Sequence, residues 1–187
     1  MAVPSFDFLD SMAWDIVVAA VLVGVAALRL PYKASSDSVE EGNRKLRTGF
    51  AAAIGLSGLY LFITGLAISF MWPFQAIVTI GGSPTNVLSA YNVLFGGIAT
   101  LGGLVLLATA GALFLNGGLS AVSYFAVVGG IYAVVDAIAI INKNYTKTPL
   151  VAALGYLGFA VAAFLSVPAT HSDNKMLRWL FAISAFL

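Results

Sequence analysis

The sequence predicts an all-α fold: a polytopic transmembrane helix bundle with five full spans and a short or truncated sixth. Of its 187 residues, 60% are hydrophobic and 9% are charged, whereas soluble domains carry roughly 25% charged residues. The apolar residues form long uninterrupted stretches, and about 20 such residues in a helix cross a bilayer core of about 30 Å. The 9 basic and 8 acidic side chains are too few to cover a water-exposed surface.

Six apolar segments account for most of the chain, so the whole of it, residues 1–187, is predicted to be a single bundle. The predicted spans are, in order, residues 8–30, 48–72, 88–115, 119–141, 149–167 and 175–187.

Charged residues and proline set the ends of the first two spans. The first ends at Arg29, and the second stops at Trp72-Pro73. The hydrophilic stretch between them, residues 31–47, is predicted to be a solvated cytoplasmic loop. Acidic residues with capping-box spacing within it also allow a short helical turn before the second span.

Turn-forming residues separate the next three spans. The third closes at Asn116-Gly117-Gly118, and the fifth lies between Pro149 and Pro168. Between the second and third spans, Gly81-Gly82-Ser83-Pro84 is interpreted as a turn, because it lacks the lysine and the spacing of a phosphate-binding loop.

The last segment is too short to cross a membrane. From Met176 to Leu187 it has 12 residues, which make roughly 18 Å of helix. Either it enters the membrane partway, or the natural protein continues past Leu187. We favour the second explanation, because nothing near Leu187 resembles a stop.

The basic residues predict a multi-pass protein of the cell membrane with its N-terminus outside. Lysine and arginine are enriched in cytoplasmic loops. This orientation places seven basic residues in the cytoplasm and two, Lys143 and Lys147, outside. The outside loop also contains Asn144-Tyr145-Thr146, which is a sequon for N-glycosylation at Asn144.

Small residues recur inside the spans and predict helix-packing faces. Lipid gives helices no hydrophobic reason to associate, so small residues must let backbones approach closely. The predicted small pairs are Gly55 with Gly58, Gly65 with Ser69, Ala99 with Gly103, Ala108 with Ala112, and Gly155 with Gly158.

The composition offers no set of residues for a catalytic, cofactor-binding or metal site. We therefore expect that the protein is not an enzyme and binds no cofactor. There is no cysteine, which excludes disulfides, thiolate metal sites and iron–sulfur ligation. His171 is the single histidine and falls in a predicted polar loop, so a bis-histidine haem or a copper centre cannot form within one chain. A net charge of +1 gives no basis for binding nucleic acid.

Two carboxyl groups fall inside predicted spans, in the half of the membrane nearest the outside. Asp15 lies about one and a half turns from the outer end of the first span, and Asp136 lies about six residues from that of the fourth. An ionisable residue at mid-membrane costs about 2.5–3.5 kcal/mol on insertion scales, and such residues normally face a bundle interior, a water-filled cavity or a partner.

Three interpretations of this pair stay open. The two carboxyls could form a proton or cation site that opens outward, or each could meet a residue of a neighbouring subunit. The favoured interpretation is plainer: each reaches the interface or accepts hydrogen bonds within the chain, for example from Tyr132 one turn before Asp136. Asn92, at the start of the third span, is a further candidate polar contact between helices or in a pore.

Short motifs are spread along most of the chain. They are Phe6-Asp7-Phe8-Leu9, Thr64-Gly65 with Met71-Trp72-Pro73, Asn92 with Leu94-Phe95-Gly96, Asp136, and Thr146-Lys147-Thr148-Pro149. With these motifs the chain resembles a family of small polytopic proteins, mostly archaeal, that is known only as a domain of unknown function. The resemblance implies a bundle in a cell membrane and carries over no activity.

The expected function is that of a non-catalytic accessory subunit of a larger membrane complex, with a respiratory or electron-transfer complex as the favoured host. Faces of small residues are typical of a bundle that packs against other subunits. So are intramembrane aspartates that no basic residue within a span neutralises. Its partners would be the lipid bilayer and other membrane subunits, with a quinone or lipid contact at an interface. The alternative is a stand-alone small carrier or ion channel that uses its intramembrane aspartates.

Overall fold

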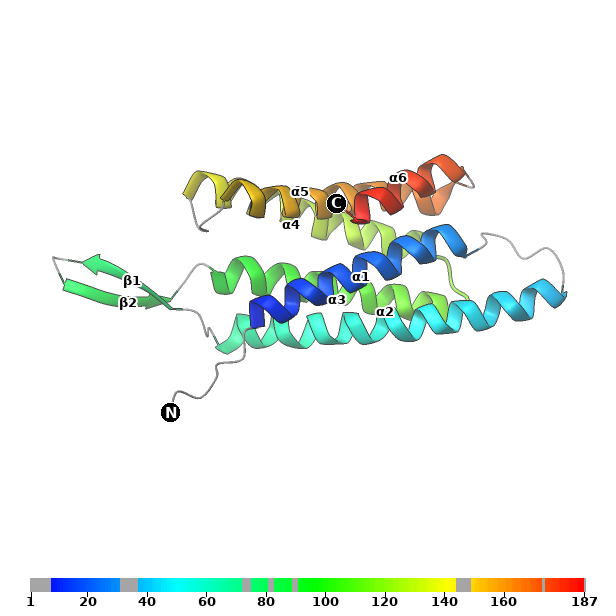
Figure 1. Ribbon diagram of the computed structural model, residues 1–187, viewed down its shortest axis with the longest axis horizontal. Helices are drawn as coiled ribbons and strands as arrows, with labels where there is room; N and C mark the ends of the chain where they lie inside the picture. Colours follow the sequence, from blue (N-terminus) through cyan, green and yellow to red (C-terminus); the bar gives the residue numbers. More distant parts are fainter. Residues whose placement is uncertain are drawn as a thin grey trace.

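Six helices and one β-hairpin make up the described part of the chain (Figure 1). The computed structural model describes residues 8–30, 37–71, 75–80, 83–88, 91–143, 149–172 and 174–186. The elements are α1 (Phe8–Arg29), α2 (Asp37–Met71), β1 (Gln75–Ile80), β2 (Ser83–Leu88), α3 (Tyr91–Phe114), α4 (Ser120–Lys143), α5 (Pro149–His171) and α6 (Lys175–Phe186).

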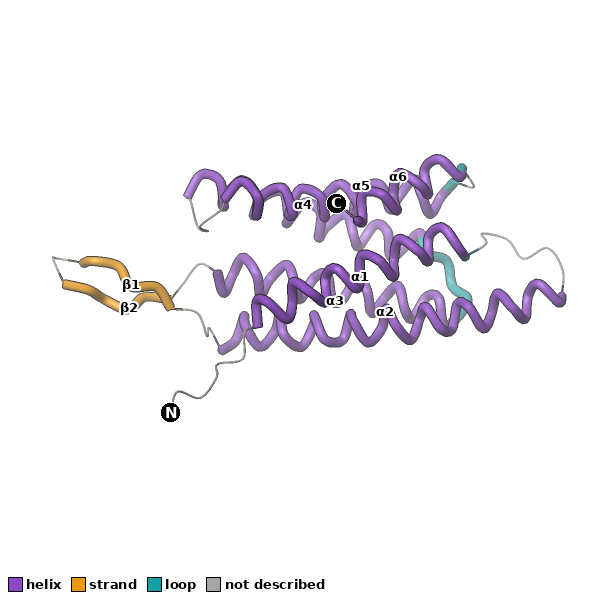
Figure 2. The backbone as a smooth tube through the Cα atoms, in the orientation of Figure 1, coloured by secondary structure: helices purple, strands orange, loops and turns teal. Residues whose placement is uncertain are grey.

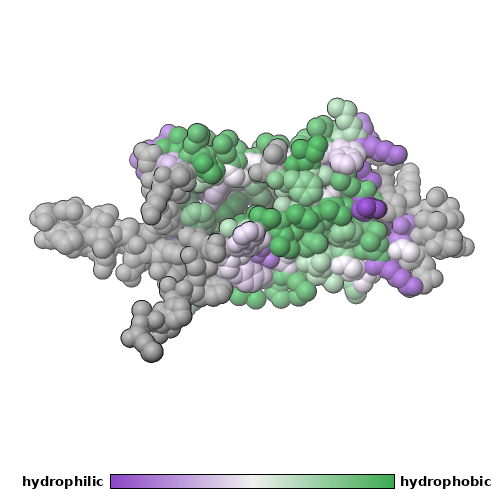
Figure 3. All heavy atoms as spheres, in the orientation of Figure 1, coloured by the Kyte–Doolittle hydropathy of each residue, from purple (hydrophilic) through white to green (hydrophobic). Residues whose placement is uncertain are grey.

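Five of these helices, α1 to α5, are long and apolar enough to span a membrane, as predicted for a multi-pass membrane protein. The sixth, α6, has 12 residues and is the predicted short element. Figure 3 shows hydrophobic side chains over the middle of one face and hydrophilic ones gathered at one end. That end, where α2 begins and α3 ends, is called the basic end below. The opposite end, where α2 ends and α3 begins, is called the hairpin end.

The helices close into a ring in chain order. Each helix packs on the next one in the sequence, and α6 packs back on α1. The most extensive contacts join α2 to α3 and α4 to α5. In Figure 1 the first three helices form the lower layer and the last three the upper layer. Two tight helix pairs are thus held together by α1 and α6 on one side and by the α3–α4 contact on the other.

Small residues bring α2 and α3 together, as predicted. A side-chain carbon added at Gly65 would lie 2.5 Å from the Thr100 nitrogen, and one at Gly58 would lie 2.9 Å from the Leu107 nitrogen. The predicted pair on α5 behaves differently, because no atom from another part of the chain lies within 4 Å of that position at Gly155. At Gly155, α5 therefore makes no close helix contact with the described part of the bundle.

The prediction of a loop over residues 31–47 is wrong from Asp37 onward, where the chain is helical, and residues 31–36 lie outside the described residues. Helix α2 begins at Asp37, has 35 residues and runs without a break into the apolar span. Acidic residues come first in this extension and basic residues follow. The helix dipole favours negative side chains in the first turn of a helix. Once the span is helical, each added residue extends it without a new nucleation cost, so the short helical turn considered from the sequence becomes a long extension.

The predicted stop of the fifth span at Pro168 is also wrong, because α5 continues to His171. Proline lacks the N–H that would bond to the carbonyl four residues earlier, so a mid-helix proline costs a hydrogen bond. Only three residues follow Pro168 in the helix, and they are anchored locally. Thr170 Oγ1 donates to the Val167 carbonyl at 3.1 Å, and His171 Nδ1 lies 2.8 Å from the same oxygen. His171 is consequently a helix-end residue and not a loop residue.

The β-hairpin was not predicted. Its strands are antiparallel, and the register runs from Gln75 opposite Leu88 to Ile80 opposite Ser83. Figure 2 shows it projecting from the hairpin end of the bundle. The expected turn at Gly81-Gly82-Ser83-Pro84 falls partly outside the described residues, because residues 81 and 82 are not described. The run Ile77-Val78-Thr79 is β-branched and carries the missed signal for a strand.

Helix α6 lies along one half of the bundle only. Near its start, Arg178 Nη2 donates to the Leu30 carbonyl at 2.9 Å, just past the last residue of α1. Near its end, the ring of Phe186 lies against Gly24, within the C-terminal third of α1. The 12 residues of α6 extend about 18 Å, so α6 lies between α1 and α5 in the basic-end half and does not reach the hairpin end.

Candidate intramembrane site

A face of small residues carries Asp136 into the bundle. The buried residues of α4 that share this face are Ala126, Gly129, Gly130, Ala133, Ala137 and Ile140. All of them except Ile140 have small side chains, which let neighbouring helices approach α4 closely, and Asp136 on the same face becomes buried with them. Asp136 is 5% exposed.

Two tyrosines and the first turn of α3 surround this position. The hydroxyl of Tyr156, on α5, donates to the Leu94 carbonyl at 3.1 Å. The hydroxyl of Tyr132, on α4, donates to the Val93 carbonyl at 3.4 Å. A charge on Asp136 interacts electrostatically with both phenol groups. The site therefore joins α3, α4 and α5 near the hairpin end.

One carboxyl oxygen of Asp136 has no partner in this arrangement. Its Oδ2 is buried and makes no hydrogen bond to any described residue. Tyr132, the donor expected from the sequence, uses its hydroxyl on a backbone carbonyl instead. An ionised carboxyl buried without a counter-charge costs several kcal/mol. The group is therefore expected to hold a proton or to take up a ligand.

Asn92 lies in the same turn of α3 as the carbonyls that accept from the tyrosines. Its side chain is 0% exposed and has an interaction partner. Asn92 and Asp136 are thus both buried near the hairpin end, where α3 meets α4 and α5.

Tyr156 was missed from the sequence. A tyrosine inside an apolar span is itself a signal, because its hydroxyl needs a partner when buried.

Asp15 has a different environment. Ser57 Oγ, from α2, donates to Asp15 Oδ2 at 2.8 Å. One turn away on the same helix pair, the Tyr60 hydroxyl donates to Ser11 Oγ at 2.6 Å. The plain interpretation, in which the carboxyl accepts a hydrogen bond within the chain, holds for Asp15.

The structure does not bring the two aspartates into one site. Asp15 lies on α1, which packs on α2 and α6, whereas Asp136 lies on α4, which packs on α3 and α5. Asp15 Oδ2 accepts a hydrogen bond from α2, and Asp136 is buried within the bundle. Asn144, the candidate glycosylation residue, lies outside the described residues.

The described residues include no group of three or more histidine, cysteine, aspartate or glutamate side chains that could hold a metal ion. The ring of the single histidine also meets an aromatic ring: the rings of His171 and Tyr124 lie edge-on, with centroids 5.4 Å apart.

Comparison with known proteins gives a family without an assigned activity. No curated protein and no solved structure matches the chain. Residues 1–187 match the model of a family described as "Protein of unknown function (DUF981)", which agrees with the resemblance seen in its motifs. The chain therefore belongs to the DUF981 family of proteins of unknown function.

Proposed function

We propose that this chain is a small carrier or ion channel of the cell membrane, with Asp136 as the group that takes up and releases a proton or a small cation. The observation that carries the proposal is the buried Oδ2 of Asp136, which has no hydrogen-bond partner among the described residues. Ionisable groups inside a membrane bundle typically mark ion or proton pathways.

The surroundings of Asp136 support this role. The hydroxyls of Tyr132 and Tyr156, which bond to carbonyls of α3's first turn, lie within electrostatic range of the Asp136 carboxyl. A proton leaving the carboxyl would find hydroxyl groups as the first acceptors, and a small cation would find oxygen ligands. Asp136 is seven residues from Lys143, the end of α4, or about 10 Å along the helix.

Asp136 lies in the half of the bundle nearest the hairpin end, because α4 ends there at Lys143. With the N-terminus outside, as the positive-inside rule predicts, this half of the bundle faces the outer leaflet. We propose that exchange at Asp136 takes place from that side.

Reconstitution tests the proposal. The purified protein in liposomes, under a pH gradient and a potassium diffusion potential, is expected to move protons, measured with a pH-sensitive dye inside the vesicles. Asp136→Asn keeps the shape of the side chain but cannot exchange a proton, so the flux should fall to the level of empty liposomes. Asp15→Asn is the matched control, because Ser57 already satisfies that carboxyl, and it should leave the flux unchanged. A flux that survives Asp136→Asn, or no flux in the unaltered protein, refutes the proposal.

The second candidate is the non-catalytic accessory subunit, in a respiratory or electron-transfer complex as favoured from the sequence. Its specific support is Gly155 on α5, an exposed glycine at which an added side-chain carbon would meet no atom of another described helix within 4 Å. A helix of another subunit could approach the α5 backbone closely there. Mild extraction followed by native sizing separates the candidates: a complex much larger than 19.4 kDa, with reproducible partners, favours the subunit, and a small homo-oligomer excludes it.

A further inference from the structure

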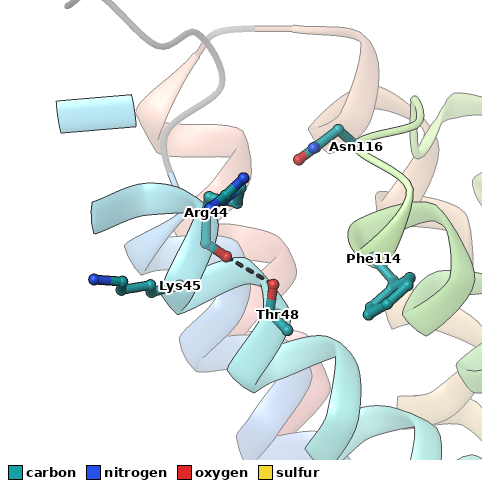
Figure 4. Close-up of a pocket in the computed structure, with 5 residues that line it drawn as sticks. All are labelled: Arg44, Lys45, Thr48, Phe114 and Asn116. Atoms are coloured by element: carbon teal, nitrogen blue, oxygen red, sulfur yellow. Dashed lines mark hydrogen bonds between the residues drawn. The ribbon is translucent and has the colours of Figure 1, made fainter. Parts of the chain in front are cut away.

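A recess lies at the basic end, between the start of α2 and the end of α3. It is lined by Arg44, Lys45, Thr48, Phe114 and Asn116 and has a volume of about 470 Å³. Figure 4 shows the Arg44 side chain and the Asn116 amide facing each other across it, with Lys45 on the outer flank of α2. Neither the aspartates nor the proposed transport site uses this region.

The end of α3 holds Asn116 in a fixed position. Its φ is 53°, the left-handed conformation that closes many helices. The Gly117 amide donates to the Ala112 carbonyl at 2.7 Å, and the Asn116 amide donates to the Leu113 carbonyl at 3.4 Å. These two bonds form a Schellman motif, which presents the side chain of Asn116 toward α2.

The polar groups of the recess are suited to an anion. Arg47 Nη1 donates to Asn116 Oδ1 at 3.3 Å, which engages the amide oxygen and leaves the amide NH₂ as a donor. The Thr48 hydroxyl donates to the Arg44 carbonyl at 2.9 Å (Figure 4). The guanidinium of Arg44 and the ammonium of Lys45 add two positive charges. Arginine and lysine with a neutral N–H donor are the groups that recognise phosphate in proteins.

Apolar surface adjoins this cationic recess. Lys45 also borders a second recess, of about 270 Å³, whose other lining residues are Leu22, Leu46, Gly49, Phe50 and Ala53. On the α3 side, Phe114 is 65% exposed and Leu115 is 78% exposed. The recess thus lies where the apolar spans meet the basic extension of α2, at the level of lipid head groups.

We propose that the basic end binds one anionic phospholipid. Its phosphate contacts Arg44 and the Asn116 amide, Lys45 adds a positive charge on the outer flank of α2, and an acyl chain lies along the apolar recess between α1 and α2. A free phosphate would use the charges but not this apolar groove, so the adjoining surface favours a lipid. Basic pockets between transmembrane helices at the cytoplasmic side bind such head groups in other membrane proteins. This proposal does not depend on transport at Asp136.

Lipid titration with matched variants tests it. The protein in detergent is titrated with phosphatidylglycerol, phosphatidylcholine or inorganic phosphate, and bound lipid is counted by native mass spectrometry. One phosphatidylglycerol per chain should be retained in preference to phosphatidylcholine, and Arg44→Gln should weaken its binding at least tenfold. Lys175→Gln removes a charge at the same end without touching either recess, and it should change nothing.

The variant Asn116→Gly separates a loss of lipid binding from a loss of folding. Glycine is the preferred residue for the left-handed position, so the helix end is kept while the amide donor is removed. Binding should weaken several-fold with unchanged thermal stability. Equal binding by all variants, equal retention of phosphatidylcholine, or displacement of the lipid by inorganic phosphate at equal concentration would each overturn the proposal.

Discussion

The contact between α2 and α3 should be intolerant of a single methyl group at Gly103. Gly103 lies on α3 where that helix crosses α2. A side-chain carbon added there would be 2.7 Å from the Gly58 carbonyl oxygen, 2.7 Å from the Phe62 Cα and closer still to the Phe62 amide nitrogen. All three atoms belong to the backbone, so no side-chain rotation can relieve the overlap and the two helices must separate.

The size of the effect follows from a comparison along the same helix. Overpacking a close contact costs about 1–3 kcal/mol, whereas replacing glycine by alanine in a helix gains up to about 1 kcal/mol in helix propensity. Gly111 also lies on α3, and a carbon added there meets no atom within 4 Å. Because both substitutions share the propensity gain, it cancels between them. Gly103→Ala should therefore be less stable than Gly111→Ala by about 1–3 kcal/mol.

Unfolding in mixed micelles measures this difference. The purified variants are titrated with sodium dodecyl sulfate, and the transition is followed by circular dichroism together with tryptophan fluorescence. Gly103→Ala should shift the midpoint to a lower detergent fraction, and Gly111→Ala should leave it unchanged or raise it slightly. Equal midpoints for the two variants would show that α2 and α3 do not approach as closely as the glycines indicate.

Two further predictions concern single hydrogen bonds. Arg178→Gln replaces the charged guanidinium that joins α6 to the Leu30 carbonyl at the end of α1 by a shorter, neutral amide. Because bonds from charged groups contribute about 1.5–3 kcal/mol, stability should fall measurably in the same detergent titration, while Lys175→Gln should stay within about 0.5 kcal/mol of the unaltered protein. Tyr156→Phe removes the hydroxyl that bonds to the Leu94 carbonyl, for a loss of about 0.6 kcal/mol, the average for such bonds between membrane helices. Tyr124→Phe is its control, since Tyr124 is exposed, and an equal loss in both would contradict the assignment.

The spans were predictable because apolar length is a local property of the sequence. The five long helices follow from it directly, and so do the glycine contacts of α2 with α3, because small residues inside an apolar span have few other uses. The errors arose where context overrides a local signal. Pro168 is a strong helix breaker in isolation, but near a helix end it removes a single bond. The hydrophilic run from Asp37 to Arg47 is helical because it extends a helix that already exists.

The candidate site was predictable only in part, because burial depends on which helices become neighbours. Asp136 and Asn92 could be singled out as polar residues in apolar spans. Their common location could not, because it depends on α3 and α5 both packing on the small-residue face of α4. Tyr156 enters the site through that packing alone.

The contrast between the two aspartates shows how neighbouring side chains decide the chemistry of a carboxyl in an apolar span. From the sequence, Asp15 and Asp136 are equivalent: each stands in an otherwise apolar helix at a similar depth. Asp15 faces a serine on α2 that donates directly to its carboxyl, so Oδ2 of that carboxyl has a hydrogen-bond partner within the chain. Asp136 faces two tyrosines whose hydroxyls are directed to backbone carbonyls of α3. Those hydroxyls leave Oδ2 of Asp136 buried without a hydrogen-bond partner among the described residues. This difference, and not the depth of the two residues in their helices, is the reason why the proposed proton or cation exchange is assigned to Asp136 and not to Asp15.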